Sequence, residues 1–399
     1  MRASAQTATS IDTARGPLTG STRRIGLGGA FVALADDSEG VAINPASVAL
    51  RLPYSWSWWD YGFGVDFSIG GWLPKNDLYN QGTDGTGKSS ALFGSLAAVL
   101  YAGHFGVGAA AEAQSNAASR PQEEQGVARN FSANFGMVHS SAAYGFLDNQ
   151  LLIGAGARFV GMSFDARGSG GALSTAGAGY TAGVTYKPAA HQYRIAAAYK
   201  SSIRAEVPGE AGEDPTRVDV PWELALGFTY QWGRRVMNPR FVSVDEVARG
   251  YSGGAEPSKE DRKRAERQLF EDYQRRQRRY VLVSTELSVI QGDADHVGVE
   301  RLWTKSGTAS AGRPVILPRV GVEAEVVPHV LRLRAGSYYE AERVNLKPVR
   351  LHGTGGLDVR LFRWNVFGLI GPFDYWQLSV AADAARAYLN TSFSIGFWH

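Results

Sequence analysis

The chain has 399 residues and no cysteine, which excludes disulfides, thiolate nucleophiles and cysteine-ligated metals, and we expect neither a cofactor nor a metal site. A formal net charge of +3 is too balanced to indicate a nucleic-acid partner. The length suits one large barrel or two ordinary domains, and the mean hydropathy of −0.19 does not exclude a β-barrel, whose lipid-facing and lumen-facing residues cancel.

The N-terminal residues 1–52 do not alternate as strands do. No apolar signal-peptide core is visible in residues 1–20, so we expect a mature exported chain with an added Met1. The glycine-rich start of residues 24–50 lacks the strand–helix–strand setting of a dinucleotide fingerprint. Asp36 and Asp37 have no histidine nearby in the sequence, and helix capping or a turn is favoured over acid catalysis or cation binding.

Residues 222–232 show the pattern that dominates the rest of the chain. Even positions from Trp222 to Trp232 are apolar or aromatic, and odd positions are polar or very small. Because successive strand residues point to opposite faces, one face is apolar with tryptophan at both ends. About eleven residues with aromatic ends match the thickness of a bilayer, whereas strands of a soluble sandwich usually run about five or six residues.

Repetition of this alternation predicts an all-β fold, a transmembrane antiparallel β-barrel of about 14 strands, an even number as in bacterial barrels. Residues 53–399 would form the barrel, and because a barrel of this size encloses a wide lumen, residues 1–52, rich in Gly, Ala and Val, can pack inside it as a plug. A single membrane helix over 89–113 is an alternative, but Ala102-Gly103-His104 interrupts the run and favours a strand hairpin. We expect strands near 54–73, 89–101, 104–115, 127–146, 150–164, 174–187, 191–205, 218–233, 279–290, 317–327, 330–342, 349–362, 374–383 and 388–398.

The connections after even-numbered strands are mostly tight, and those after odd-numbered strands are mostly longer. Short turns belong on the periplasmic side of outer-membrane barrels and long loops outside. The alternation therefore predicts a bacterial outer-membrane protein with both termini in the periplasm.

One hairpin has a register that can be worked out. If Pro328-His329 is a two-residue turn, unlike charges oppose one another on one face and apolar residues on the other, as cross-strand pairing favours. A slip of one residue would turn the charges toward lipid, so we expect a lumenal ion-pair ladder; a solvated face of a soluble sheet is the alternative. The expected pairs are Glu325 with Arg332 and Glu323 with Arg334, and, on the apolar face, Val326 with Leu331 and Ala324 with Leu333.

Other basic side chains face the lumen by the same parity. Arg158, Arg194 and Lys200 are the candidates, either for pairing with lumenal acids or for meeting the carboxylate of a ligand.

Residues 234–278 form an unusually long connection on the side of the short turns. Ser258 followed by Asp261 resembles a helix-start capping pair, and residues 259–278 are predicted to form a charged helix with a narrow apolar stripe. We expect a solvated helix across the barrel mouth; a docking element for a periplasmic partner or a basic surface for lipid headgroups are the alternatives.

The N-terminal segment resembles the hatch of outer-membrane long-chain fatty acid transporters of the FadL/TodX type. The residues that carry the resemblance are Gly28-Gly29-Ala30-Phe31, Ala35-Asp36-Asp37 and Asn44-Pro45-Ala46, with further support from 333–340 after Pro318-Arg319. Barrels of type 9 secretion systems share a similar hatch and are close relatives in this comparison. The large 234–278 connection and the final His399 depart from the pattern.

The resemblance implies a barrel through which a hydrophobic ligand passes to a pocket between hatch and wall, and then through a kinked third strand into the bilayer. Asn44, Pro45 and Ala46 would be the hatch element whose movement gates the passage. Gly106 and Gly108 in the presumed third strand are candidates for the kink, because glycine permits bends.

Three functional hypotheses remain open at this point. The first is passive uptake of hydrophobic molecules such as fatty acids across the lipid bilayer. The second is a barrel that scaffolds or shuttles partner proteins in a secretion or envelope complex. An outer-membrane hydrolase is disfavoured, because the seven histidines are scattered and no nucleophile–base pair stands out, so we do not expect an enzyme.

Overall fold

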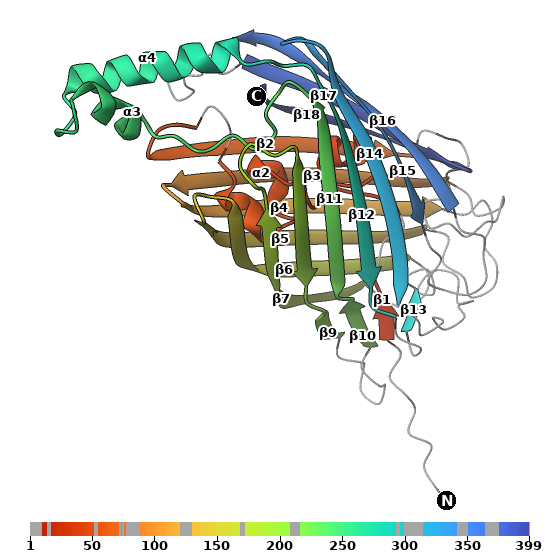
Figure 1. Ribbon diagram of the computed structural model, residues 1–399. Coiled ribbons are helices and arrows are strands. Elements are labelled where there is room, and N and C mark those ends of the chain that lie inside the picture. The colour runs from red at the N-terminus through yellow and green to blue at the C-terminus, as the bar shows by residue number, and fades with distance from the viewer. Residues whose placement is uncertain are drawn as a thin grey trace, which may run out of the picture.

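The computed structural model describes residues 10–13, 17–51, 55–71, 73, 76, 88–119, 130–167, 172–207, 216–292, 296–298, 314–340, 350–363 and 375–398. Within them, fourteen antiparallel strands close into a barrel (Figure 1). Its strands, in chain order, are β2 (Trp59–Gly70), β3 (Lys88–Ala102), β4 (Phe105–Ser119), β5 (Asn130–Phe146), β6 (Leu151–Arg167), β7 (Ala172–Tyr186), β8 (Tyr193–Lys200), β11 (Glu223–Gly233), β12 (Tyr280–Ile290), β14 (Val315–Val327), β15 (Leu331–Glu340), β16 (Arg350–Arg363), β17 (Tyr375–Ala385) and β18 (Tyr388–Trp398).

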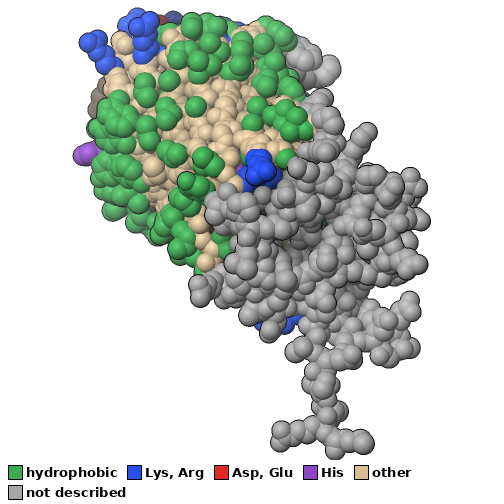
Figure 2. Space-filling model, turned by 90° about the vertical axis from the view of Figure 1, so that its right-hand side faces the viewer, with side chains coloured by type: hydrophobic (Ala, Val, Ile, Leu, Met, Phe, Trp, Pro, Cys, Tyr) green, Lys and Arg blue, Asp and Glu red, His purple; other side chains and the backbone are tan. Residues whose placement is uncertain are grey.

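Each predicted strand overlaps one barrel strand, and the hairpin of β3 and β4 occupies the stretch for which a membrane helix was the alternative. The alternation is also confirmed: Leu226, Phe228 and Trp232 are 45%, 44% and 53% exposed on the outer face, while Thr229 and Gln231 between them are buried. Figure 2 shows hydrophobic side chains gathered over the outer wall. Of the described residues, none belongs to a helix with the length and apolar character needed to cross a membrane.

The strands expected at 191–205 and 218–233 are shorter in the structure, because the chain leaves the barrel wall between them. After β8 it forms β9 (Ile203–Val207), and before β11 it forms β10 (Thr216–Val220). With β1 (Ser10–Asp12) and β13 (His296–Gly298), these make a small sheet in the order β13-β1-β10-β9. Ile203 and Val218 pack on the apolar inner faces of β5 and β6, and Pro221, which has no N–H to donate to a ladder, marks the bend.

The hairpin of β14 and β15 has the predicted charged register but a different turn. Glu323 lies opposite Arg334 and Glu325 opposite Arg332, whereas Val327, not Val326, pairs with Leu331. The loop therefore has three residues, 328–330, with His329 in the left-handed region at φ 61°. Three-residue loops of this kind carry a bulge at one strand end, and the bulge at Val326 absorbs the extra residue.

The connection at 234–278 contains two helices, α3 (Val244–Tyr251) and α4 (Lys259–Arg275). Ser258 and Asp261 form the predicted capping box at the start of α4, whereas α3 was not predicted. The aromatic rings of Trp56 and Tyr273, 6.3 Å apart, join α4 to the segment before β2. In Figure 1 the pair of helices projects beyond the barrel wall rather than lying across the mouth.

A segment that we call the lumenal segment, residues 17–51, runs inside the barrel (Figure 1) and includes α1 (Thr22–Gly26), α2 (Asp37–Gly40) and the 3-10 helix η1 (Pro45–Ala49). It is preceded by β1, which pairs with β10 and β13 at the end of the barrel opposite α4. Strand β18 ends on the side of α4. The first described strand, β1, and the end of β18 therefore lie at opposite ends of the barrel. Met1 lies outside the described ranges, as do most of the long connections, so the expectation of both termini in the periplasm stays a prediction.

Candidate functional site

The tripeptide Asn44-Pro45-Ala46 lies against the inner wall of the barrel, where the lumenal segment contacts the strands. Asn44 is fully buried; its amide Nδ2 donates to the Val32 carbonyl at 3.2 Å and to Thr185 Oγ1 of β7 at 3.0 Å. Its Oδ1 accepts from the Ala46 N–H at 3.0 Å, which caps η1. One asparagine therefore ties two parts of the lumenal segment to the barrel wall.

The wall residues under η1 are glycines. A Cβ atom added at Gly106 of β4 would overlap the carbonyl oxygen of Val48, and one added at Gly154 of β6 would overlap the carbonyl of Pro45. A Cβ at Gly108 would lie 2.8 Å from the Val48 side chain. The glycines thus allow the backbone of η1 to touch the backbone of the wall.

At Gly106 and Gly108, where a kink is predicted, the pairing of β4 is unbroken. Strand β4 pairs with β3 and with β5 from Phe105 to Ser119 without a shift in register. The physical reason is that the inward side of these glycines is filled by η1, so their missing side chains make room for packing rather than for a bend.

A second backbone contact involves the Gly28-Gly29 pair. Both residues have positive φ, 60° and 79°, which favours glycine. A Cβ at Gly28 would lie 2.6 Å from the Ser337 nitrogen of β15. The glycine motif therefore serves close approach of the lumenal segment to the wall.

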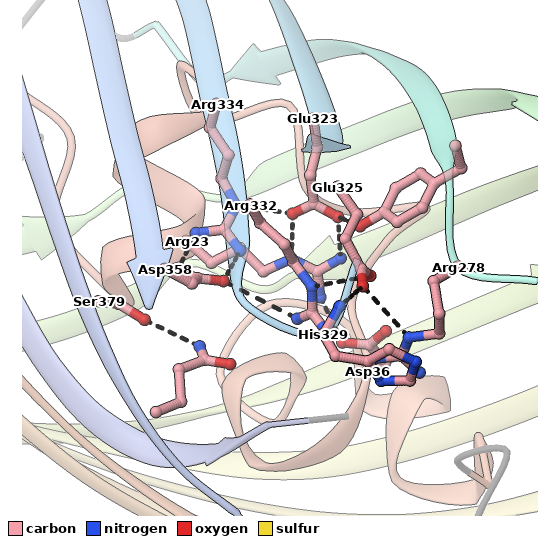
Figure 3. Close-up of polar contacts among 12 residues, drawn as sticks. Arg23, Asp36, Arg278, Glu323, Glu325, His329, Arg332, Arg334, Asp358 and Ser379 are labelled. Carbon is pink, nitrogen blue, oxygen red and sulfur yellow. Dashed lines mark hydrogen bonds and ion pairs between the residues drawn. The ribbon is translucent and has the colours of Figure 1, made fainter. Parts of the chain in front are cut away.

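The predicted charged ladder exists and extends further than the hairpin (Figure 3). Arg334 Nε lies 2.6 Å from Glu323, and its terminal nitrogens bind Asp358 of β16. Arg332 lies 3.7 Å from Glu325 and 3.8 Å from Asp358. All of these groups are buried, so each charge depends on its partners for compensation.

The ladder also holds the lumenal segment. Arg23 of α1 donates to Glu323 at 2.9 and 3.1 Å and to Asp36 at 2.9 Å (Figure 3). Burial alone would lower the pKa of Arg23, but the Glu323 and Asp36 carboxylates raise it well above its ordinary value. Arg23 therefore stays cationic and joins the lumenal segment to β14.

The capping role expected for Asp36 is wrong. It precedes α2 but makes no side-chain capping bond, because its carboxylate is engaged by Arg23. Asp37 is the first residue of α2 and has a positive φ of 48°.

Wall acids that the sequence did not single out bind backbone N–H groups of the lumenal segment. Glu286 of β12 accepts from the N–H groups of Phe31 and Val32 at 3.0 and 2.9 Å and pairs with Arg319. Asp66 of β2 accepts from the Thr22 N–H at 2.8 Å. These pairs join positions far apart in the sequence, so no local signal marks them.

The three basic candidates face the lumen as predicted but do not form one site. Lys200 pairs with Glu223 at 3.8 Å, and Arg194 donates to Asn238 Oδ1 at 2.8 Å. Arg158 donates to the Ser201 carbonyl, and its buried Nε has no partner within the described residues.

One histidine is held between two acids near the opposite end of the lumen. His352 Nδ1 lies 2.7 Å from Asp383 and its Nε2 lies 3.0 Å from Glu340. Tyr338 donates to Asp383 at 2.6 Å, and its oxygen accepts from the Leu18 N–H at 3.2 Å. The cluster anchors the start of the lumenal segment and contains no nucleophile–base pair.

A small polar cavity of about 60 Å³ lies between the lumenal segment and the wall. Its lining includes Arg23 and Glu39 from the lumenal segment, Asp66 from β2, Arg334 from β15 and Gln377 from β17. Burial and the nearby Asp66 carboxylate raise the pKa of Glu39 well above its usual range. A larger apolar groove, about 790 Å³, lies on the outer face of β3 to β7 and is lined in part by Gly136.

These features define a class: transmembrane β-barrels of fourteen strands whose lumen holds their own N-terminal segment. Among solved structures, a Pseudomonas aeruginosa FadL homologue matches over 96% of this chain and 98% of its own, with a TM-score of 0.62 and 12% identity. The monoaromatic hydrocarbon channel CymD matches over 96% and 97% (TM-score 0.55, 14% identity), and the Pseudomonas putida toluene transporter TodX over 97% and 99% (0.54, 13%). The fold is therefore that of FadL/TodX-type outer-membrane channels, as the sequence motifs predicted. No family model and no curated protein sequence matches the chain.

Proposed function

We propose that this protein is a bacterial outer-membrane channel for the passive uptake of hydrophobic, fatty-acid-like molecules. The observation that carries the proposal is the seating of Asn44-Pro45-Ala46 on wall glycines inside a closed barrel with an apolar exterior. The named functions of the structures with the same fold, a toluene transporter and a hydrocarbon channel, support it. The lipid bilayer and hydrophobic small molecules are then its partners.

In this proposal the lumenal segment is a hatch, residues 1–52, that gates the passage. Movement of η1 requires Asn44 to give up its bonds to Val32 and Thr185. Of the basic candidates, Arg158 is the best placed to meet a ligand carboxylate, because Lys200 and Arg194 already have side-chain partners.

The experiment is uptake of radiolabelled oleate into liposomes that contain the purified protein. Asn44→Ala removes the link between η1 and β7, so we expect faster uptake than with the wild-type protein. Asn134→Ala, at an exposed position on the outer face of β5, is the matched control and should leave uptake unchanged. Wild-type liposomes that take up no more oleate than empty ones would refute the proposed function.

The orientation follows the length of the connections: the end with the short turns, with α3 and α4, faces the periplasm. A second candidate function, a barrel that scaffolds or shuttles partner proteins, rests on the projecting charged helices. Deletion of residues 242–275 tests it and spares Asn238 and Arg278, which bind the wall. Loss of a co-purifying periplasmic protein with uptake intact would favour the second candidate.

A further inference from the structure

The barrel closes where its first and last strands meet, and this seam is incomplete at the end that carries the short turns. Strands β2 and β18 pair from Gly70–Asn390 to Val65–Ile395, where the pairing stops. Both strands are regular beyond that point: β2 stays paired with β3 as far as Trp59, and β18 with β17 as far as Trp398. Among the described residues, the break therefore concerns only the contact between the two strands.

Side chains cover the outside of this gap, and on its inside Ser38 of the lumenal segment lies beside Gly64. Phe63 and Phe397 project outward and touch edge to face, with ring centroids 4.8 Å apart. The inward positions opposite each other are Gly64 and Gly396, and a Cβ at Gly396 would find no atom within 4 Å. One aromatic contact thus stands where a backbone ladder would otherwise continue.

The polar cavity of about 60 Å³ lies directly behind these two rings, because its lining includes Phe63, Gly64, Gly396 and Phe397. Its inner walls are the charged groups of the lumenal segment and of β2 and β15. Gln377 also lines it, and the buried side-chain oxygen of Gln377 has no hydrogen-bond partner within the described part of the chain. The cavity thus offers an unused acceptor to a ligand that can donate.

A small polar cavity behind two aromatic rings favours a ligand with a small polar head and an apolar chain. Liquid water occupies about 30 Å³ per molecule, so the cavity has room for one small polar group and not for a hydrocarbon ring or chain. A compact head such as a carboxylic acid or hydroxyl would meet polar walls there, while an attached chain would extend between the two rings into the bilayer. A pure hydrocarbon would gain nothing from those walls.

We propose that amphiphiles with one compact polar head leave the lumen sideways through the seam between β2 and β18, where the rings of Phe63 and Phe397 cover the opening and must separate to let a ligand pass. The proposal rests on the proposed uptake function and assigns the exit to this seam in place of the β4 wall, whose ladders are unbroken.

A reversible cross-link tests the seam directly. The chain has no cysteine, so the pair Phe63→Cys and Phe397→Cys introduces the only thiols of the protein. The control pair is Phe67→Cys and Phe393→Cys, which lie opposite each other in the paired part of the same seam. Cross-linking is verified by mass spectrometry, and a short bis-methanethiosulfonate reagent bridges either pair if no disulfide forms.

We expect the oxidised 63/397 pair to reduce dodecanoic acid uptake into liposomes to the level of protein-free vesicles, and a reductant to restore it. The oxidised 67/393 pair should transport like its reduced form. Wild-type rates with a verified 63/397 cross-link would overturn the seam assignment while leaving the uptake function intact. Wild-type liposomes without any uptake would overturn both.

A second measurement tests the head group. Dodecane uptake should stay well below that of dodecan-1-ol, whose hydroxyl can donate to Gln377, and Gln377→Leu should narrow the difference by slowing the alcohol alone. Equal uptake of the two compounds by the wild-type protein would overturn the assignment of the cavity to a polar head.

Discussion

Because η1 packs directly on the wall glycines, adding a single methyl group at one of them should disturb the contact. In Gly106→Ala the new Cβ overlaps the Val48 carbonyl oxygen, and because that atom belongs to the backbone, no side-chain rotation relieves the clash. Overpacking of this kind typically costs about 1–3 kcal/mol. Either the barrel loses that free energy of unfolding, or η1 leaves its seat.

The matched control is Gly136→Ala on the neighbouring strand β5. A Cβ at Gly136 meets no atom within 4 Å, because this residue faces the outer groove. Urea unfolding of both variants in liposomes, followed by tryptophan fluorescence, gives the free energies. Limited proteolysis of the lumenal segment reports whether η1 has moved. If Gly106→Ala differs from Gly136→Ala by less than about 0.5 kcal/mol and its proteolysis is unchanged, the close-contact reasoning is refuted.

Three further predictions concern charge and capping. Arg23→Met leaves Glu323 short of one cation and should lower the free energy of unfolding by about 3 kcal/mol; the effect should shrink markedly in the Glu323→Gln background, and full additivity of the two changes would contradict the pairing. Lys187, in the turn after β7, has its pKa lowered to about 7 by burial and by Arg194. Between pH about 7 and the ordinary value near 10.5, Lys187 is protonated in the unfolded chain but largely neutral in the folded chain. The free energy of unfolding should therefore rise with pH across that window and be lowest below it. Lys187→Met should flatten the profile measured by urea unfolding, and an unchanged slope would contradict the burial effect. Ser258→Ala removes the capping box of α4 and should destabilise that helix by about 1 kcal/mol, seen as faster amide exchange over α4, whereas unchanged exchange there would show that the cap contributes nothing.

The barrel was predictable because its signal is local. A two-residue period, such as that of 222–232, reports directly which face each side chain occupies, and opposed charges then set the register of Glu323 with Arg334. The turn between them was not predictable from charge alone. Both a two-residue and a three-residue loop preserve those pairs, and what distinguishes them is the pairing of Val327 with Leu331 and the bulge at Val326.

The partners of the lumenal segment could not be found in this way. Arg23 meets Glu323 across 300 positions of sequence, and Asn44 meets Thr185 across 141. Gly106 illustrates a different difficulty: a glycine inside a strand permits either a bend or a close approach, and the choice depends on what lies behind it. The Asn44-Pro45-Ala46 motif marked a segment that lies inside the barrel but gave no information on which wall residues it contacts.

The parallel pairing of β1 with β10 and β13 constrains the order in which the molecule is made. Among the described strands, β1 pairs with segments some 200 and 280 positions later in the sequence, at Arg217–Asp219 and His296–Gly298, so this sheet forms only after both segments have been made. The lumenal segment must also enter the space that the pairing of β18 with β2 closes. If the wall closes first, this segment has to pass into a complete barrel, so the relative timing of these two steps sets the route by which the lumen is filled.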